Sequence, residues 1–200
     1  MAYIGDIHGC RRELDEVLEH ALSRSNRLIF LGDYVNRGPD SRGVLDRLST
    51  LAADPKVDTV FLRGNHDSSL LDFLNGGDVI DFLMMGGAST ILNYLANPLG
   101  DIAENFRKAF PPAHKRFLES LVDSNSAENV LATHDLLRTD SSRFVVHGHV
   151  VQSSLTPLIS ATSAAIDTGC GTTEGGRLSV FYWPERNWFQ SGAWDSDTNP

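Results

Sequence analysis

Short apolar runs, polar loops and amphipathic helices follow one another in a regular order over about the first 70 residues. The run 28–31 has the length and composition of a buried strand, and Gly32 allows a sharp turn where that strand ends. The predicted strands are 2–5, which is too short to make more than an edge of a strand, 28–31 and 59–62; the predicted helices are 11–24, one after the 32–41 loop to about residue 53, and one from about residue 68. This order predicts an α/β sheet with its active-site loops at the strand ends.

The pattern changes to helices alone over residues 70–123. Glycine pairs and prolines separate predicted helices at about 78–85, 88–96, 101–109 and 111–122. Strands resume at 129–133, 144–146, 163–166 and 178–183, and the tail from residue 184 is expected to be an irregular segment packed on the body. We therefore predict one domain over residues 1–200, with a helical cap inserted at about 70–123.

Composition and charge exclude several functional classes. With 41% apolar and 22% charged residues, the chain has the composition of a globular domain. The formal net charge of −9 and the lack of a basic run argue against a nucleic-acid binder. No apolar stretch is long enough to span a bilayer, and no leader-like segment precedes Asp6, so we expect a cytoplasmic protein without membrane contact.

The chain has two cysteines, Cys10 and Cys170. They cannot form a disulfide framework, and neither belongs to a CxxC pair. Both closely follow motif glycines, so a redox role near the site is one interpretation. The preferred interpretation is that both are small packing residues.

Residues that suit metal ions stand at the ends of the predicted strands. In chain order these motifs are Gly5-Asp6-Ile7-His8-Gly9, Gly32-Asp33, Gly64-Asn65-His66-Asp67, His134-Asp135 and His147-Gly148-His149. Five of the seven histidines lie in or next to these motifs. A repeated coincidence of this kind predicts one site, assembled from several loops at the same edge of the sheet.

Side-chain alternation along an extended chain orients two of these motifs. Residues two apart in a strand point the same way, so Asp6 and His8 can reach one cation while Ile7 turns into the core. If the third motif is also extended, Asn65 can face the metals while His66 faces the substrate. The two motifs would then present ligands to a common centre.

Asp33 lies between these motifs and has two oxygens, so it can bridge two cations. Oxygen and imidazole ligands without thiolate suit manganese, iron, zinc, nickel or cobalt better than a structural zinc. Two cations bridged by Asp33 and a solvent molecule would lower that water's pKa to give hydroxide, and would hold a phosphoryl group for in-line attack. Arg37 is the best placed arginine for the remaining phosphoryl oxygens.

The series of motifs resembles that of the calcineurin-like metallophosphoesterases. The resemblance rests on Gly5-Asp6-Ile7-His8-Gly9, Gly32-Asp33-Tyr34-Val35-Asn36-Arg37-Gly38, Gly64-Asn65-His66-Asp67, His134 and Gly148-His149, and it covers most of the chain. Within this family the chain is similar to the phosphoprotein phosphatase type, which includes bacterial and phage protein phosphatases and symmetrical diadenosine tetraphosphatases. Residues 83–90 and 166–178 also look like the bacterial members.

The resemblance implies an α/β fold of four layers, α/β/β/α, with the site on loops at one end of the central sheets. It implies two divalent metal ions, for which manganese is the first choice: Asp6, His8 and Asp33 would bind one, and Asp33, Asn65, His134 and His149 the other. His66 would be the general acid that protonates the leaving alkoxide, and Arg37 would hold the phosphate. A second arginine is usual, and either Arg138 or Arg143 could supply it.

Asn36 departs from the family pattern, in which an aspartate orients the acid histidine and supports its charged form. An amide can orient an imidazole but supplies no charge. We therefore expect His66 to be a weaker base, so that the limb of the pH profile that reports this acid moves down. Alternatively, Asp67, Asp40 or another carboxylate takes the place of the missing charge.

Val151 is the second departure. Wider members of the family carry there a histidine that binds the first metal, so its absence fits the phosphoprotein phosphatase type and leaves a water at that position. His147 is then expected to support a ligand rather than to bind the metal itself.

Three functions are compatible with these residues. The first is hydrolysis of phosphoserine or phosphothreonine in proteins, and the alternative is hydrolysis of diadenosine polyphosphates or another nucleotide at the same site. A dinucleotide would need a pocket with stacking surfaces, but cap aromatics such as Phe73, Phe82 and Phe106 are at helical spacing and are expected to be core. A catalytically idle binding module is disfavoured because no inferred ligand is missing. The expected partner is thus a phosphoprotein or a small phosphate ester.

Overall fold

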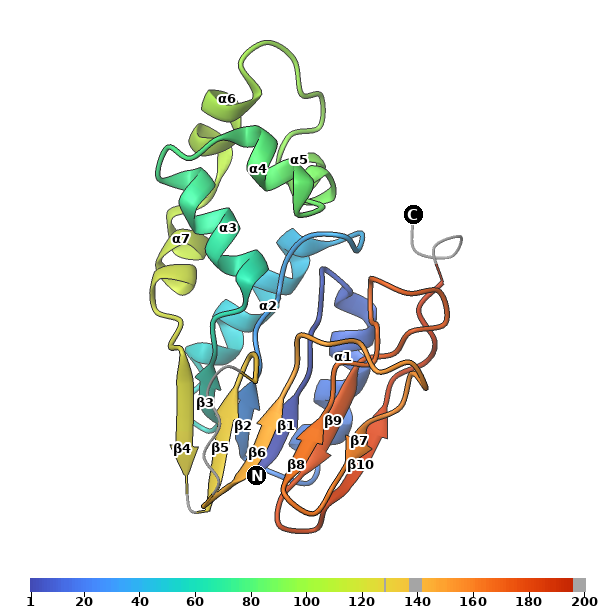
Figure 1. Ribbon diagram of the computed structural model, residues 1–200. Helices are drawn as coiled ribbons and strands as arrows, with labels where there is room; N and C mark the ends of the chain where they lie inside the picture. The colour runs from blue at the N-terminus through green and yellow to red at the C-terminus, as the bar shows by residue number, and fades with distance from the viewer. Residues whose placement is uncertain (128, 137–141, 196–200) are drawn as a thin grey trace.

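The computed structural model describes residues 1–127, 129–136 and 142–195, which form two five-stranded sheets and seven helices. The first sheet has the order β10-β9-β1-β2-β3. Its strands are β1 (Ala2–Ile4), β2 (Arg27–Phe30), β3 (Asp58–Phe61), β9 (Ser179–Tyr182) and β10 (Asn187–Gln190). Strands β1, β2 and β3 are parallel, so their carboxyl ends meet at one edge, the upper one in Figure 1.

The second sheet packs against the first and has the order β4-β5-β6-β8-β7. Its strands are β4 (Ser124–Ala127), β5 (Val130–Thr133), β6 (Phe144–His147), β7 (Leu158–Ile159) and β8 (Ser163–Ala165). Strands β5, β6 and β8 are parallel, whereas β4 and β7 run antiparallel at the two edges. Between the sheets lies a buried apolar cluster that includes Tyr3, Ile29, Leu31, Val130, Val146, Ile166 and Phe181.

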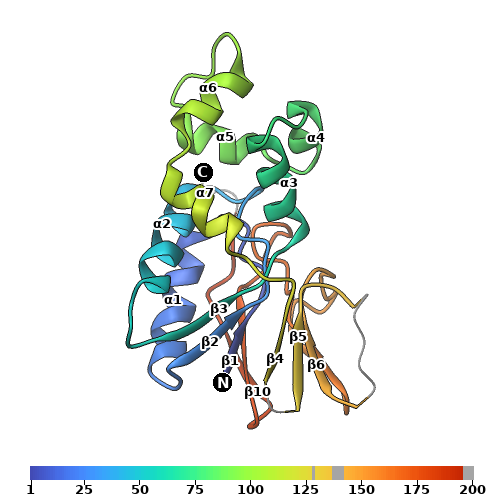
Figure 2. The same cartoon turned by 90° about the vertical axis from the view of Figure 1, so that its left-hand side faces the viewer.

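Helices cover the other face of the first sheet and rise above its upper edge (Figures 1 and 2). The two helices on the sheet are α1 (Arg11–Leu22) and α2 (Ser41–Ala52), and the five that follow are α3 (Asn65–Leu74), α4 (Val79–Met84), α5 (Ala88–Tyr94), α6 (Ile102–Ala109) and α7 (Pro112–Glu119). Successive side chains of β2 point to opposite faces of the sheet. Leu28 and Phe30 belong to the apolar cluster on the helix side, and Ile29 belongs to the cluster between the sheets.

Aromatic side chains form the core of the helical region. Phe73, Phe82 and Phe106 are at most 1% exposed. The ring of Phe73 lies 5.0 Å from that of Phe82 and 5.3 Å from that of Phe106. The expectation that these aromatics are core is confirmed, so none of the three rings is available to stack on a ligand.

The predicted α/β fold with two packed sheets and a helical cap is confirmed, with a difference in the outermost layer. Within 129–136 and 142–195 no residue is helical. In the described part of the chain, helices therefore cover the first sheet alone. None of the described helices is both long and apolar enough to cross a membrane.

The short first strand is not at an edge. β1 pairs with β2 on one side and with β9 on the other, which places Ala2–Ile4 at the centre of the sheet. Its partner β9 lies about 180 residues further along the chain. A three-residue strand is stable there because neighbours on both sides satisfy its backbone groups, and the sequence around residues 2–5 carries no sign of them.

The tail is not irregular throughout, because Asn187–Gln190 pairs with β9 as β10. This strand forms the edge of the first sheet. Trp188 on it is 42% exposed, while Phe189 stacks on His20 of α1 with ring centroids 3.9 Å apart. An exposed aromatic on the outer face conceals the alternation that marks a half-buried strand.

The cap is joined to α2 through a buried histidine. The two ring nitrogens of His114 lie 2.8 Å from the Tyr94 hydroxyl and 2.9 Å from Asp46 Oδ1. His114 is 3% exposed. A neutral imidazole offers one donor and one acceptor, so Tyr94 donates to Nδ1 and the Nε2–H group donates to Asp46.

Replacing Tyr94 with phenylalanine should test this link. The change leaves the buried Nδ1 of His114 without its donor, and we expect the free energy of unfolding in urea to fall by about 1–3 kcal/mol. Lys108→Ala is the control, because it removes an exposed pair with Glu104 within one helix, for which a loss of about 0.3–0.5 kcal/mol is typical. A loss for Tyr94→Phe no larger than that of the control would contradict the link.

Candidate active site

Asp33 lies where the loops after β1, β2, β3, β5 and β6 meet, at the upper edge of the sheets. Its Oδ2 is 3.7 Å from His8 Nε2 and 3.5 Å from His134 Nε2. Two clusters of potential ligand atoms share this carboxylate: His8, Asp33 and His66 in one, and Asp33, His134 and His149 in the other, with the atoms of each within 4.8 Å of one another. The shared carboxylate stands between two groups that could each hold a cation.

Backbone carbonyls orient two of these imidazole rings. His8 Nδ1 lies 3.2 Å from Val35 O, and His134 Nδ1 lies 2.9 Å from Leu31 O. Because a carbonyl only accepts, each Nδ1 carries the proton of a neutral ring and each Nε2 presents a lone pair toward Asp33. Burial lowers the pKa of His8 to about 4, which favours the neutral form of that ring. This is the tautomer that metal-binding histidines adopt.

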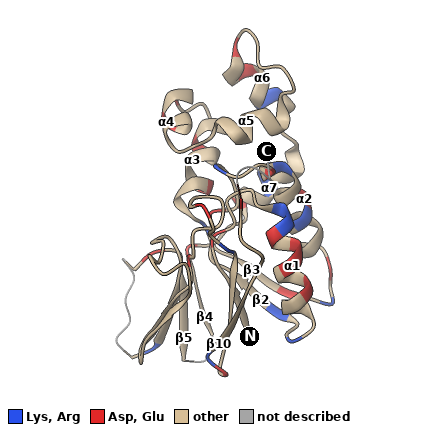
Figure 3. Cartoon of the chain, turned by 90° about the vertical axis from the view of Figure 1, so that its right-hand side faces the viewer, with Lys and Arg blue, Asp and Glu red and all other residues tan. Residues whose placement is uncertain are grey.

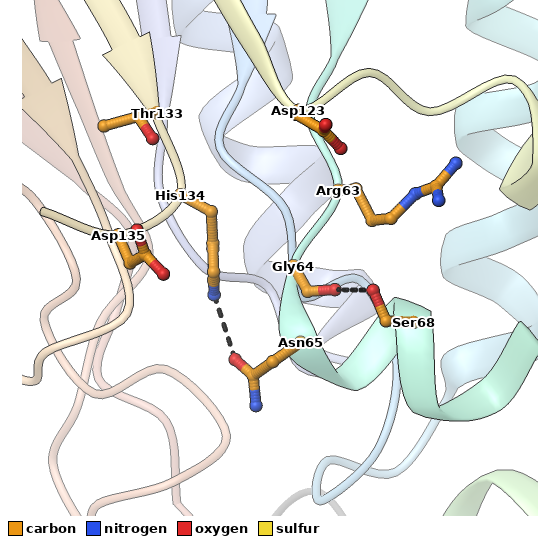
Figure 4. A pocket seen from close by; sticks show the side chains of 8 residues that line it. All are labelled: Arg63, Gly64, Asn65, Ser68, Asp123, Thr133, His134 and Asp135. Carbon is orange, nitrogen blue, oxygen red and sulfur yellow. Dashed lines mark hydrogen bonds between the residues drawn. The ribbon is translucent and has the colours of Figure 1, made fainter. Parts of the chain in front are cut away.

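The Asn65 amide oxygen converges on the same centre. Asn65 Oδ1 lies 3.0 Å from His134 Nε2, and His149 Nδ1 lies 3.2 Å from that nitrogen. Figure 4 shows the Asn65 and His134 side chains pointing toward each other. An amide oxygen and an unprotonated imidazole nitrogen have no proton to share, so a cation is the partner that suits both.

Asp6 has an oxygen for which the described residues provide no partner. Its Oδ2 accepts a hydrogen bond of 3.1 Å from the His149 amide, whereas its buried Oδ1 accepts none. Burial and then the charges of Asp167 and Asp33 raise the pKa of Asp6 well above its usual value. Figure 3 shows the acidic segments among these loops. A cation would favour the ionised carboxylates, so the donor set fits a divalent metal.

The backbone at this site differs from the extended geometry that the sequence analysis assumed. β1 ends at Ile4, and His8 has a φ of 46°, so Asp6 and His8 lie in a loop, although Ile7 is fully buried. Asn65 and His66 are the first residues of α3 rather than extended. Their side chains still diverge, because successive residues of a helix lie about 100° apart around its axis.

His66 is surrounded by Arg37 and Asn36. Its Nδ1 lies 3.2 Å from Asn36 Nδ2, its Nε2 lies 3.4 Å from an Arg37 Nη, and its backbone amide donates to Asp33 Oδ1 at 2.9 Å. Burial is the main cause that lowers the pKa of His66. Asn36 is fully buried. The three side chains proposed for catalysis therefore lie together.

Neither carboxylate considered as a substitute for the usual aspartate reaches the His66 ring. Asp67 accepts from the backbone amides of Asp33, Tyr34 and Gly64. Asp40 accepts from Gly43 N at the start of α2. Both carboxylates hold loops, so the Nδ1 of His66 faces an amide.

Strained backbone gathers at this site. Of the seven described residues other than glycine with positive φ, five are His8, Asp33, Asn36, Arg37 and His149. Such conformations cost free energy and persist where the surroundings fix them, which is common at functional sites.

The remaining candidates are placed differently. Arg138 lies outside the described residues. Arg143 precedes β6, at the opposite end of that strand from His149, so the structure does not bring it to the site. His147 is buried, and its Nδ1 lies 3.2 Å from Gly148 O. It belongs to neither of the two clusters of ligand atoms.

A pocket of about 300 Å³ adjoins Asn65 and His134, and Arg63, Ser68, Asp123 and Asp135 also line it (Figure 4). Sequence reasoning missed Arg63 as a lining residue. Its position next to the Gly64-Asn65-His66-Asp67 motif was the available signal. The pocket gives room beside the candidate metal ligands for the part of a substrate that does not react.

Comparison with known proteins gives matches to one family. The family model described as calcineurin-like phosphoesterase matches residues 1–157. A symmetrical bis(5'-nucleosyl)-tetraphosphatase of Legionella pneumophila (strain Lens) is 45% identical over 76 residues, which is 37% of this chain and 26% of the relative. The enzyme of the same name from Coxiella burnetii (strain Dugway 5J108-111) is 47% identical over 70 residues, 34% of this chain and 22% of the relative.

The matched part thus spans about a quarter of the length of these curated relatives. Among solved structures, a metallophosphoesterase from Sphaerobacter thermophilus aligns with a TM-score of 0.61 and 18% identity, over 99% of this chain and 91% of that one. At that identity the structural match concerns the fold.

Gly148→Ala should weaken metal binding. A Cβ at this position would lie 2.0 Å from Asp6 Oδ1, so that carboxylate would have to move. We expect Mn²⁺ affinity measured by calorimetry to fall at least about tenfold, the size of effect seen when supports of metal ligands are removed. Gly192→Ala is the control, because its Cβ would approach nothing closer than 3.6 Å. Equal affinities of the two variants would contradict the placement of Asp6 in the metal site.

Proposed function

Because this chain belongs to the calcineurin-like phosphoesterase family, we propose that it hydrolyses a dinucleoside tetraphosphate with the help of two divalent metal ions. The observation that carries the proposal of a two-metal phosphoesterase is the position of Asp33 Oδ2, within 3.7 Å of His8 Nε2 and 3.5 Å of His134 Nε2. One carboxylate shared by two ligand clusters suits a pair of cations that hold one phosphoryl group.

We assign the residues as follows. Asp6, His8 and Asp33 would hold one metal, and Asp33, Asn65, His134 and His149 the other, with manganese as the first choice. When bound, the two ions supply positive charge and lower the pKa of water. Arg37 binds phosphoryl oxygens through its planar guanidinium, and His66 faces the leaving group.

Asn36 supports an anhydride substrate over an alkyl ester. Its NH₂ group faces His66 Nδ1 at 3.2 Å. A doubly protonated His66 would set one N–H against another, and burial also lowers the pKa of this ring. The charged, doubly protonated form of His66 is therefore less populated than that of an ordinary histidine, so less general acid is available, although the Nε2–H of the neutral ring can still donate a hydrogen bond.

Leaving groups differ in their need for that proton. The alkoxide of phosphoserine is strongly basic and depends on a general acid, a role worth about 10²–10⁴-fold in rate. A nucleotide leaves from a phosphoanhydride as a weakly basic phosphate. The two curated relatives, which are named as symmetrical tetraphosphatases, support the same substrate class.

A phosphoserine or phosphothreonine protein is the second candidate substrate, and one observation favours it. The cap aromatics Phe73, Phe82 and Phe106 are buried against one another, so they offer no stacking platform for a nucleobase. The substrate would then be held chiefly through its phosphoryl group.

Initial rates on three substrates should separate these candidates. For manganese-loaded protein, we expect kcat/KM to be at least about tenfold higher for diadenosine tetraphosphate than for a phosphoserine peptide, with a small aryl phosphate between them. His66→Ala is the blank. A higher kcat/KM for the peptide would make a phosphoprotein the first candidate substrate. If no substrate is turned over while metals are bound, the assignment as a phosphoesterase is overturned.

Asn36→Asp should change the turnover of phosphate monoesters more than that of phosphoanhydrides. A carboxylate beside Nδ1 stabilises the charged ring and raises the pKa of His66, so the acid stays protonated to higher pH and the limb of the rate profile that it sets moves up. We expect turnover of the phosphoserine peptide to rise about tenfold and that of the anhydride to change less. An unchanged pH profile would mean that another group already supplies the charge.

A further inference from the structure

The side-chain amide of Asn36 contacts three polar groups of the described residues. Its Nδ2 lies 3.2 Å from His66 Nδ1 and 3.4 Å from Met85 O. Its Oδ1 accepts a hydrogen bond of 2.8 Å from Thr90 Oγ1. Asn36 and Thr90 are both fully buried, so water does not provide an alternative partner. Two of the three groups, Met85 O and Thr90 Oγ1, belong to the helical cap.

The hydrogen bonds around Thr90 fix which hydroxyl donates and which accepts. The Asn36 backbone amide donates to Ser41 Oγ and to Thr90 Oγ1, both at 3.0 Å, and the two hydroxyl oxygens lie 2.9 Å apart. Thr90 has a single hydroxyl proton, which points to Asn36 Oδ1. The Ser41 hydroxyl therefore donates to Thr90, and each donor has an acceptor.

Turning the amide over would break this pattern. Exchange of Oδ1 and Nδ2 would place the amide oxygen 3.4 Å from Met85 O, with no proton between two acceptors. It would also place the NH₂ group against the Thr90 proton, which would have to rotate toward Ser41. A buried pair of unsatisfied polar groups costs about 1–3 kcal/mol each, so the surroundings select one orientation.

We propose that Thr90 is a positioning residue that acts through Asn36 on His66. Its hydroxyl holds the amide with the NH₂ group toward His66, and that group donates to Nδ1 and fixes the proton of the neutral ring on Nε2. Nε2 lies 3.4 Å from an Arg37 Nη, which only donates, so that contact opposes a proton on Nε2. The Asn36 contact at Nδ1 is shorter, at 3.2 Å, and comes from a fully buried side chain, so we expect it to set the tautomer. A cap helix thereby decides which ring nitrogen can donate to the substrate.

Thr90 also stabilises the strained backbone on which both site residues stand. Asn36 and Arg37 have φ values of 71° and 68°. The Thr90 hydroxyl oxygen accepts a hydrogen bond from the Asn36 amide, and Gly86 O accepts one from the Arg37 amide at 3.2 Å. Loss of the Thr90 hydroxyl leaves Ser41 Oγ as an acceptor for the Asn36 backbone amide, so that amide keeps one of its two acceptors.

The tautomer of His66 is the direct readout. Long-range ¹H–¹⁵N spectra of the metal-free protein, assigned with His66→Gln, should place the ring proton on Nε2 in the unaltered chain. Thr90→Val keeps the shape of the side chain but cannot donate, and should yield a mixture of both tautomers. Thr90→Ser should restore the Nε2–H form. Thr90→Ala is the second variant to use if the Thr90→Val protein does not fold.

Kinetics provide a further arm, which rests on the proposed function. With diadenosine tetraphosphate we expect Thr90→Val to lower kcat about tenfold and to change KM less than about twofold. In an Asn36→Ala background the same change should have no further effect, because the amide through which Thr90 acts is gone. Ser89→Ala removes a hydroxyl on the same helix that, within the described residues, donates to Gly86 O at 3.5 Å, and this change should leave kcat unchanged.

Retention of the single Nε2–H tautomer in folded Thr90→Val and Thr90→Ala would overturn the proposal, as would an equal fall in kcat in the Asn36→Ala background. If the unaltered chain hydrolyses no phosphate substrate, the proposed function fails while the spectra still decide the role of Thr90.

Discussion

The close approach of buried carboxylates is the constraint around which this molecule is arranged. Asp6, Asp33, Asp67 and Asp167 are each at most 2% exposed and lie in the loops above the parallel strands. Asp67 accepts three hydrogen bonds from backbone amides and thereby holds two loops together. The buried Asp6 Oδ1 instead has no partner among the described residues, and Asp33 Oδ2 lies between the two clusters of potential ligand atoms. Backbone amides thus stabilise the Asp67 carboxylate, whereas the Asp6 and Asp33 carboxylates would be stabilised by bound cations.

The cap contributes to the site as well as covering it. Asn93 of α5 donates to Pro39 O and accepts from Ser41 N, both at 2.7 Å, and Gly86 O accepts from Arg37 N. These contacts hold the loop that carries Asn36 and Arg37. The aromatic core of the cap and the His114 link to α2 therefore bear on catalysis through the position of one loop. The cap therefore supports the candidate site through hydrogen bonds to this loop and contributes none of the candidate metal ligands.

An amide in place of a carboxylate beside His66 need not mean loss of activity. It removes support for the charged ring while it keeps the ring oriented, and the requirement for a charged acid depends on the leaving group. A site of this kind is suited to phosphoanhydrides, whose products leave without a proton. The candidate metal ligands would serve either class of substrate equally.

Local patterns in the sequence indicated most of the strands and helices and the residues brought to one edge, and the resemblance to a family implied the two packed sheets. Apolar runs such as 28–31 and amphipathic segments such as α1 are local signals, and the spacing of the Asp and His motifs follows from them. The long-range partners of β1, the presence of β10 and the helical start at Asn65 were not readable, because each depends on contacts with distant parts of the chain.

Which carboxylates hold loops and which adjoin the candidate metal ligands depends on contacts between distant parts of the chain. The direction of the Asn36 amide belongs to the same category. A side chain with a donor at one end and an acceptor at the other takes its orientation from groups such as Thr90 Oγ1 and Met85 O, more than 45 residues away. No local pattern encodes that choice, since hydrogen-bond direction is set by the complete set of neighbours in a buried space.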